Sequence, residues 1–250
     1  MTDRRIGLAR ALSKIGCCSR SQAFELVRSG KVSLNGNVTR NPEAPVRESK
    51  DRISIDGKPI AAAEPVYLML NKPRGLVTTA SDEKGRATIY SLLPLDLPWL
   101  APVGRLDKAS EGLLLLTNDS EWAARITNPE SHLDKTYHVQ IAAVADPRLL
   151  AAIQNGVRSE GELLAVKRAS ILRGGEKNTW IEILLDEGRN RQIRRVFQAL
   201  DVEVLRLVRV AIGPLQLGSL PKGQSRQLGA AERQAIDAQL LPSSLQARKA

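Results

Sequence analysis

The sequence of 250 residues predicts an α+β protein with two domains. Residues 6–57 combine two amphipathic helix patterns with short alternating strands that close on Asn-Gly and Asp-Gly turns. The stretch Ala-Ala-Ala-Glu-Pro then interrupts this pattern and is typical of a linker. Beyond it, strand patterns alternate with helix patterns. We therefore expect an N-terminal domain at 1–60, a linker at 61–65, a larger domain at 66–228 and a C-terminal tail at 229–250.

The N-terminal domain should begin with two short helices. Apolar residues spaced along one face predict a first helix that ends at Gly16. Ser19 stands three residues before Gln22, which is the spacing of a capping box, so a second helix should begin there and end at Gly30. The Asn35-Gly36 dipeptide that follows, between alternating apolar residues, predicts a β-hairpin.

Charge gives the first indication of function. The chain has 37 basic and 27 acidic residues, a net charge of +10, and residues 1–60 contribute twelve basic and six acidic residues to it. Such an excess favours a polyanionic partner, because each neutralised phosphate releases a counterion, although a solvated basic surface is the simpler alternative. Aromatic residues make up only 3%, which argues against a sheet that stacks on bases.

Composition also argues against several classes of protein. Cys17 and Cys18 are adjacent and the chain has only two histidines, so we expect no metal site and no disulfide framework. No apolar run reaches membrane length, and the first residues do not resemble a signal peptide. We therefore expect a cytoplasmic protein without a membrane segment.

The larger domain is organised around residues 104–119. Four consecutive leucines, 113–116, followed by Thr-Asn-Asp, predict a short strand that is buried on both faces. The Gly-rich segment before it, 104–112, should be a loop that carries Arg105 and Asp107 to the rim of this strand.

This stretch resembles a known catalytic motif. Gly-Arg-Leu-Asp, then Ser-x-Gly, then Leu-Leu-Leu-Leu-Thr-x-Asp, is similar to the motif of the pseudouridine synthases that act on ribosomal RNA. The resemblance implies that Asp107 is the catalytic carboxylate and that Arg105 enters the space left by a flipped-out base. It also implies a mixed, largely antiparallel sheet flanked by helices. Ser120 departs from the family, which often has glycine there, and this puts the shape of the turn in doubt.

Three further segments resemble motifs of the same family. Lys72-Pro73-Arg74-Gly75 looks like the Lys-Pro-x-Gly turn that supports the catalytic loop. The alternating strand 135–141 places Tyr137 on its buried side, where it could be a core residue, but its Lys-x-Tyr motif implies a contact with the target base. The segment Gly-Arg-Asn-Arg-Gln-Ile-Arg at 188–194 resembles the motif whose last arginine, here Arg194, pairs with the catalytic aspartate. We expect Arg189 and Arg191 to bind RNA.

The N-terminal domain resembles an S4 RNA-binding domain. The resemblance runs from Ile6 to Val38 and includes Cys-Ser-Arg-Ser before the second helix and Gly-Lys-Val-x-Leu-Asn-Gly after it. In that family the basic residues of these helices contact phosphate. The basic residues that lead into or lie along the two helices here, which we expect to bind RNA, are Arg4, Arg5, Arg10, Lys14, Arg20, Arg28 and Lys31.

These resemblances together imply a bacterial ribosomal RNA pseudouridine synthase with an N-terminal S4 domain. It would isomerise one uridine, need no metal or other cofactor, act as a monomer on ribosomal RNA or a pre-ribosomal particle, and favour large-subunit RNA. A glycosidase that uses Asp107 and Glu111 is one alternative, but both carboxylates lie in a cation-rich segment. A catalytically silent S4-type ribosomal RNA-binding factor is the other.

Overall fold

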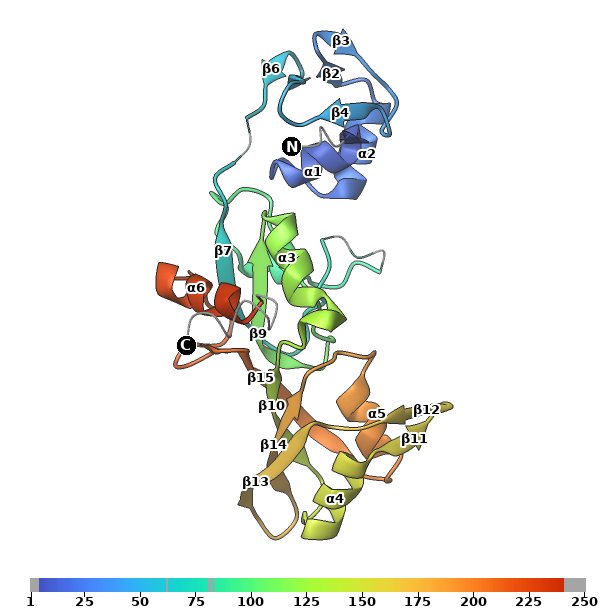
Figure 1. Ribbon diagram of the computed structural model, residues 1–250, viewed down its shortest axis with the longest axis vertical. Coiled ribbons are helices and arrows are strands. Elements are labelled where there is room, and N and C mark those ends of the chain that lie inside the picture. Colours follow the sequence, from blue (N-terminus) through green and yellow to red (C-terminus); the bar gives the residue numbers. More distant parts are fainter. Residues whose placement is uncertain (1–4, 62, 81, 83, 241–250) are drawn as a thin grey trace. The chain divides into compact units, whose positions relative to one another are not determined.

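The computed structural model describes residues 5–61, 63–80, 82 and 84–240 (Figure 1). Its contacts divide the chain into two units. The first contains residues 1–67 together with 93–102 and 116–122, and the second contains the rest of the chain. In the described part of the chain, no helix has the length and apolar character needed to cross a membrane.

The first unit begins with two helices beside small sheets. Apolar side chains of these elements form one buried cluster, which includes Leu8, Leu12, Ala23 and Val27. The elements are β1 (Arg5–Gly7), α1 (Leu8–Lys14), α2 (Arg20–Arg28), β2 (Val32–Leu34), β3 (Asn37–Val38), β4 (Pro45–Arg47), β5 (Ile53–Ile55) and β6 (Lys58–Pro59). Strand β1 pairs with β4, and the other four form a sheet in the order β3-β2-β5-β6.

The predicted local signals of this unit are confirmed. Ser19 and Gln22 form both hydrogen bonds of the capping box at the start of α2. Asn35 and Gly36 have φ angles of 53° and 85°, as a two-residue hairpin turn between β2 and β3 requires. Asp119 accepts hydrogen bonds from the amides of Glu121 and Trp122, so the Thr-Asn-Asp turn caps the next helix, α3 (Ser120–Thr127), with serine at its first position.

The second unit is built on a mixed sheet with the order β13-β14-β10-β15-β9-β7-β17, in which β8 and β16 pair at the sides of β9 and β15. Every pairing whose register is resolved is antiparallel except that of β9 with β15, which is parallel. The strands are β7 (Tyr67–Lys72), β8 (Ala101–Val103), β9 (Glu111–Thr117), β10 (Lys135–Ile141), β13 (Arg168–Gly174), β14 (Thr179–Leu185), β15 (Val204–Ile212), β16 (Leu215–Gln216) and β17 (Ser225–Gln227). The expected mixed, largely antiparallel sheet is thus confirmed.

Two helices cover one face of β10 and β14 (Figure 1). They are α4 (Pro147–Asn155) and α5 (Gln192–Gln198). Alternate residues of the strands, such as Val139 and Ile181, pack with Val196 and Phe197 of α5 in one apolar cluster. The remaining elements are η1 (Ile89–Leu92), η2 (Pro129–Ser131), the hairpin β11 (Val157–Ser159) with β12 (Glu162–Leu164), and α6 (Ala230–Gln239). This face of the sheet supports the segment that precedes α5.

At Gly112 the backbone of β9 lies close against the backbone of β15. Gly112 lies opposite Arg209 in the parallel pairing and has a φ angle of +101°. A Cβ atom at this position would lie 2.2 Å from the carbonyl oxygen of Arg209, which belongs to the backbone and cannot turn aside. Only glycine therefore allows the two strands to approach this closely.

One strand beside the predicted loop is longer than expected. Strand β9 starts at Glu111 rather than at the first leucine, because the pairing with β15 extends the strand across the glycine. Strand β7 ends at Lys72, immediately before Pro73, and near its end the amide of Asn71 donates to the carbonyl oxygen of Gln224. The hairpin β11–β12 was not predicted, and the tail forms α6, beyond which residues 241–250 lie outside the described part.

We expect Gly112→Ala to lower the free energy of unfolding by at least about 2 kcal/mol, because it adds both a backbone clash and a strained φ angle. The matched control is Gly174→Ala at the end of β13, where an added Cβ would meet nothing within 4 Å. A urea titration should show a change of less than about 1 kcal/mol for the control. Equal stabilities of the two variants would contradict the close approach at Gly112.

Candidate active site

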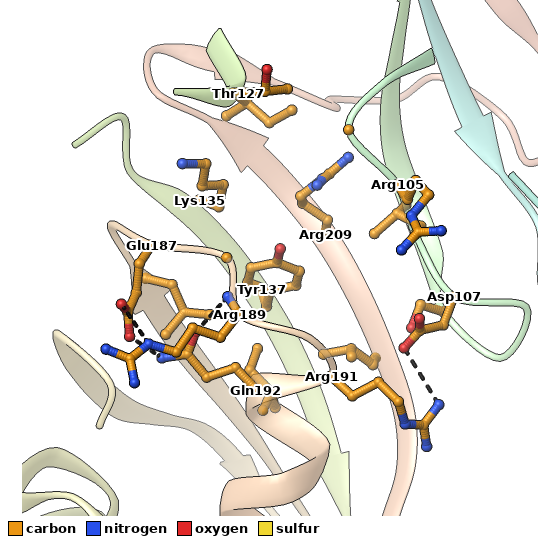
Figure 2. Close-up of a pocket in the computed structure, with 18 of the residues that line it drawn as sticks. Arg105, Asp107, Thr127, Lys135, Tyr137, Glu187, Arg189, Arg191, Gln192 and Arg209 are labelled. Atoms are coloured by element: carbon orange, nitrogen blue, oxygen red, sulfur yellow. Dashed lines mark hydrogen bonds and ion pairs between the residues drawn. The ribbon is translucent and has the colours of Figure 1, made fainter. Parts of the chain in front are cut away.

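A cavity of about 260 Å³ lies in the second unit, where the loop before β9 faces β10, β15 and the segment before α5 (Figure 2). Several predicted site residues line it, and so do residues that were not predicted. The polar and charged side chains of its lining include those of Arg105, Asp107, Lys135, Tyr137, Glu187, Arg189, Arg191, Gln192 and Arg209.

Asp107 presents its carboxylate to this cavity from the loop between β8 and β9. Its side chain is 39% exposed, and its Oδ2 atom lies 3.5 Å from Nη1 of Arg191, as the dashed line in Figure 2 shows. Arg191 has a φ angle of 50° and immediately precedes α5. A half-exposed carboxylate with one cationic partner can reach a ligand in the cavity.

The ion pair implied for Asp107 and Arg194 is not the one that the structure contains. Arg194 instead donates hydrogen bonds to the carbonyl oxygens of Ala109 at 3.2 Å and Val204 at 3.3 Å. It lies within α5, one turn further along the chain than Arg191, and is half-buried beside the loop that carries Asp107. Burial lowers the pKa of its guanidinium, and so does the charge of Arg191, while Asp107 opposes this. Arg194 therefore supports the loop by a hydrogen bond from its side chain to the loop backbone at Ala109.

Lys72 holds the same loop from the interior. Its side chain is fully buried, and Nζ donates hydrogen bonds to the carbonyl oxygens of Asp107 at 3.2 Å, Ser110 at 2.9 Å and Pro73 at 3.1 Å. Burial lowers the pKa of Lys72 to about 8, although the charges of Asp107 and Glu111 oppose the shift. The Lys-Pro-x-Gly segment thus supports the loop by direct hydrogen bonds from its lysine.

Further hydrogen bonds fix the backbone on either side of Asp107. The hydroxyl of Thr78 donates to the carbonyl oxygen of Leu106 at 2.7 Å, and the amide of Gly75 donates to that of Lys108 at 2.8 Å. The amide of Ser110 closes a turn on the carbonyl oxygen of Asp107 at 3.0 Å. The loop is therefore rigidly supported, which is what a positioned reactive group requires.

Tyr137 lies on the core side of β10, as its position in the alternating strand predicted. It is opposite Arg209 on β15 and Ile183 on β14, and its partly buried ring packs against the apolar cluster. The same ring lines the cavity, so Tyr137 is both a core residue and a wall of the site.

Lys135 and Arg209 also line the cavity, and neither was predicted as a site residue. Lys135 precedes Tyr137 by two residues and so belongs to the same face of β10, which is the signal that could have identified it. Arg209 could not be found in this way, because its approach to the site depends on the pairing of β15 with both β9 and β10.

Arg105 is exposed at the rim of the cavity. It also lines a neighbouring cavity of about 440 Å³, whose other lining residues include Lys84, Arg86 and Lys108. Arg105 thus stands between two hollows in a basic part of the surface.

The arginines near α5 have internal carboxylate partners. Arg189 pairs with Glu187 at 3.0 Å, and Arg191 pairs with Asp107. The side chain of Arg195 is only 12% exposed and pairs with Glu160 and Glu162 of the unpredicted β11–β12 hairpin. The partners of Arg189 and Arg191 offset the unfavourable position of these two positive charges at the N-terminus of α5.

Glu111 does not share the site with Asp107. Its buried carboxylate accepts two hydrogen bonds from Arg206, each at 3.1 Å, and another from Lys222. Burial alone would raise the pKa of Glu111, but these cations outweigh it and the pKa is lowered. An ionised, ion-paired carboxylate cannot act as the protonated acid of a glycosidase, which argues against that alternative.

Most of the predicted RNA-binding residues of the N-terminal unit are exposed. They are Arg5, Arg10, Arg20, Arg28 and Lys31. Lys14 differs, because its ammonium pairs with Glu48 at 2.8 Å and with Glu121 at 3.2 Å, and the hydrogen bond that it donates to Glu48 contributes most to raising its pKa. Lys14 is therefore already neutralised within the protein, and Arg4 lies outside the described residues.

Comparisons with known proteins agree with this geometry. Residues 66–199 match the family model described as RNA pseudouridylate synthase, and residues 6–53 match that of the S4 domain. The chain is 37% identical over 223 residues to ribosomal large subunit pseudouridine synthase B of Bacillus subtilis, covering 88% of this chain and 91% of that protein. It is also 37% identical over 229 residues to an uncharacterized RNA pseudouridine synthase of Aquifex aeolicus, covering 91% and 92%.

A solved structure shows the same fold. A crystal structure of a pseudouridylate synthase superposes with a TM-score of 0.65 at 32% identity, covering 92% of this chain and 99% of that one. The match covers both the S4 range and the synthase range of this chain. The chain belongs to the RNA pseudouridylate synthase family and is an RNA pseudouridine synthase with an N-terminal S4 domain.

Proposed function

We propose that this enzyme converts one uridine of bacterial ribosomal RNA into pseudouridine, with Asp107 as the group that acts on the target nucleotide. The observation that carries the proposal is the placement of the Asp107 carboxylate, on a loop fixed by Lys72, at a cavity walled by Tyr137 and several cations. The name of the Bacillus subtilis relative specifies the large ribosomal subunit, which favours large-subunit RNA as the substrate of this chain too.

The chemistry suits a carboxylate without a co-reactant. The bond between C1′ of the ribose and N1 of uracil breaks, the ring turns, and a bond between C1′ and C5 forms. C5 loses a proton and N1 gains one, so the reaction is an isomerisation. Asp107 can attack covalently and leave again, or remove a proton from the sugar.

The target base has to leave the RNA helix before it can react. In this proposal the exposed Arg105 enters the vacated position, and the ring of Tyr137 lies against the uracil. Arg191 holds the Asp107 carboxylate directly, whereas Arg194 acts through the backbone of Ala109. The positions of Arg105, Tyr137 and Arg191 in the wall of the cavity support these roles.

We assign anchoring to residues 1–60 and catalysis to residues 66–228. The exposed cations of α1 and α2 carry no catalytic role in this scheme, and they would contact RNA phosphates. A silent RNA-binding factor would use the same basic surface but would have no need for a carboxylate at the cavity.

We expect Asp107→Asn to abolish pseudouridine formation while RNA affinity stays within a few fold, because an amide can neither attack nor accept a proton as a carboxylate does. The test is base-resolution mapping of pseudouridines in a strain that lacks the gene. The strain is complemented with the wild-type protein, with Asp107→Asn or with a control variant, Asp134→Asn. Asp134 is a suitable control because its carboxylate pairs with Lys167 outside the cavity. One site in large-subunit RNA should return with wild type and control only. Its return with Asp107→Asn would refute the role of Asp107, and no lost site in the deletion strain would favour the silent factor.

We expect activity at saturating RNA to fall as the pH rises through about 8, the pKa to which burial lowers Lys72. The ammonium of Lys72 donates hydrogen bonds to three carbonyl oxygens, but a neutral amine has only two N–H groups and would lose one of these bonds. Unfolding would not explain the loss. The ordinary pKa of lysine is 10.5, so between pH 8 and that value the unfolded state binds more protons than the folded state. The free energy of unfolding should therefore rise with pH in this range, as the cost of burying the charged lysine is relieved. Single-turnover rates that stay constant to pH 9.5 would contradict this role.

A further inference from the structure

Lys135 and Arg209 form a cationic group in the cavity that the proposed chemistry does not use. Arg209 faces Tyr137 across the pairing of β10 with β15, and Lys135 lies two residues from Tyr137 on the same face of β10. In Figure 2 the guanidinium of Arg209 lies between Lys135 and Arg105, away from the ion pair of Asp107 with Arg191. The two cations therefore belong to the cavity but not to its carboxylate.

Arg209 has an unmet need for a hydrogen-bond acceptor. The residue is only 6% exposed, and its Nε atom donates to the carbonyl oxygen of Leu113 at 2.8 Å. Its Nη2 atom is buried and has no hydrogen-bond partner among the residues that the structure describes. A buried N–H donor without an acceptor is costly, so the Nη2 atom points to a ligand that is bound during function.

Lys135 forms no ion pair with the residues that the structure describes. Its Nζ atom donates one long hydrogen bond, 3.4 Å, to the carbonyl oxygen of Asp186. Burial lowers the pKa of Lys135, and the charge of Arg209 lowers it further, against weaker opposition from Asp134 and Asp186. An anion placed between the two cations would relieve both effects.

The carboxylates that line the cavity are already engaged. Asp107 pairs with Arg191, and Glu187 binds Arg189 and Gln192. The lining as a whole carries five cationic side chains, those of Arg105, Lys135, Arg189, Arg191 and Arg209, against these two carboxylates. The anion therefore has to come from outside the protein.

We propose that Lys135 and Arg209 bind a backbone phosphodiester of the RNA, at or next to the target uridine. This inference rests on the proposed function, since it places the phosphate of the same nucleotide chain whose uridine reaches Asp107. A phosphodiester has two non-bridging oxygens and one full negative charge, which suits a guanidinium and an ammonium together. A uracil carbonyl is neutral and would leave the two charges uncompensated.

The phosphate contact gives the cavity a second fixed point. Asp107 meets the sugar at one place, and the cationic pair holds the backbone at another, so the ribose cannot rotate freely about its contact with the carboxylate. Lys135 and Arg209 are then positioning residues that select the orientation of the flipped nucleotide.

The test uses RNA in which single phosphodiesters are replaced by uncharged methylphosphonates. The RNA is a synthetic copy of the large-subunit segment that the full-length protein protects from ribonuclease, so its choice depends on binding and not on turnover. Affinity is measured for wild type, Arg209→Gln, Lys135→Gln and the control Arg168→Gln, whose side chain is exposed and outside the cavity.

One methylphosphonate should weaken the binding of wild type and control by about tenfold or more, the range of a charge-assisted hydrogen bond. The same replacement should change the affinity of Arg209→Gln and Lys135→Gln by less than about twofold, and its position identifies which phosphate is bound. Lys135→Gln keeps the test valid if Arg209→Gln fails to fold. Equal losses for all four proteins at every position would overturn the phosphate site. Pseudouridine formation by wild type on the unmodified RNA, measured in parallel, separately reports whether the proposed function fails.

Discussion

A buried ammonium group holds the loop that carries Asp107. Lys72 ends β7, and from there it donates to carbonyl oxygens at both ends of the turn from Asp107 to Ser110. An apolar side chain in its place would remove the Lys72 donor from the carbonyl oxygen of buried Ser110, at a cost of about 1–3 kcal/mol, and would leave the carbonyl oxygen of Asp107 with only the amide of Ser110. The position of the Asp107 carboxylate thus depends on a residue that never reaches the cavity.

The close approach of β9 and β15 supplies the second half of the site. With glycine at 112, the backbone of Arg209 can lie against β9, and its side chain can hold the carbonyl oxygen of Leu113 while lining the cavity. The loop and the cationic residues of β15 are therefore brought together by the same junction. A bulkier residue at this one position would displace both.

Much of this could be predicted from local signals. The capping box, the Asn-Gly turn and the buried run of leucines each specify their structure through neighbouring residues alone, and all were confirmed. Motif resemblance also placed Asp107, Tyr137 and Arg105 at one site, and they do line one cavity.

What could not be predicted depends on contacts between distant segments. Arg194 was the expected partner of Asp107, but the structure pairs Asp107 with Arg191. Arg191 has a left-handed backbone conformation, which spacing along the sequence does not reveal. Arg195 is covered because the β11–β12 hairpin brings two glutamates to it from more than thirty residues away. The roles of Lys72 and Arg209 likewise depend on which strands become neighbours in the sheet.

The most direct test of the central claim, that this cavity receives the target uridine, is a structure of the Asp107→Asn protein bound to the RNA segment that it protects. The account predicts one uridine outside the RNA helix, with its uracil against the ring of Tyr137, its ribose at residue 107 and Arg105 in the vacated position. RNA bound in a defined position with every base still stacked and the cavity empty of nucleotide would contradict it.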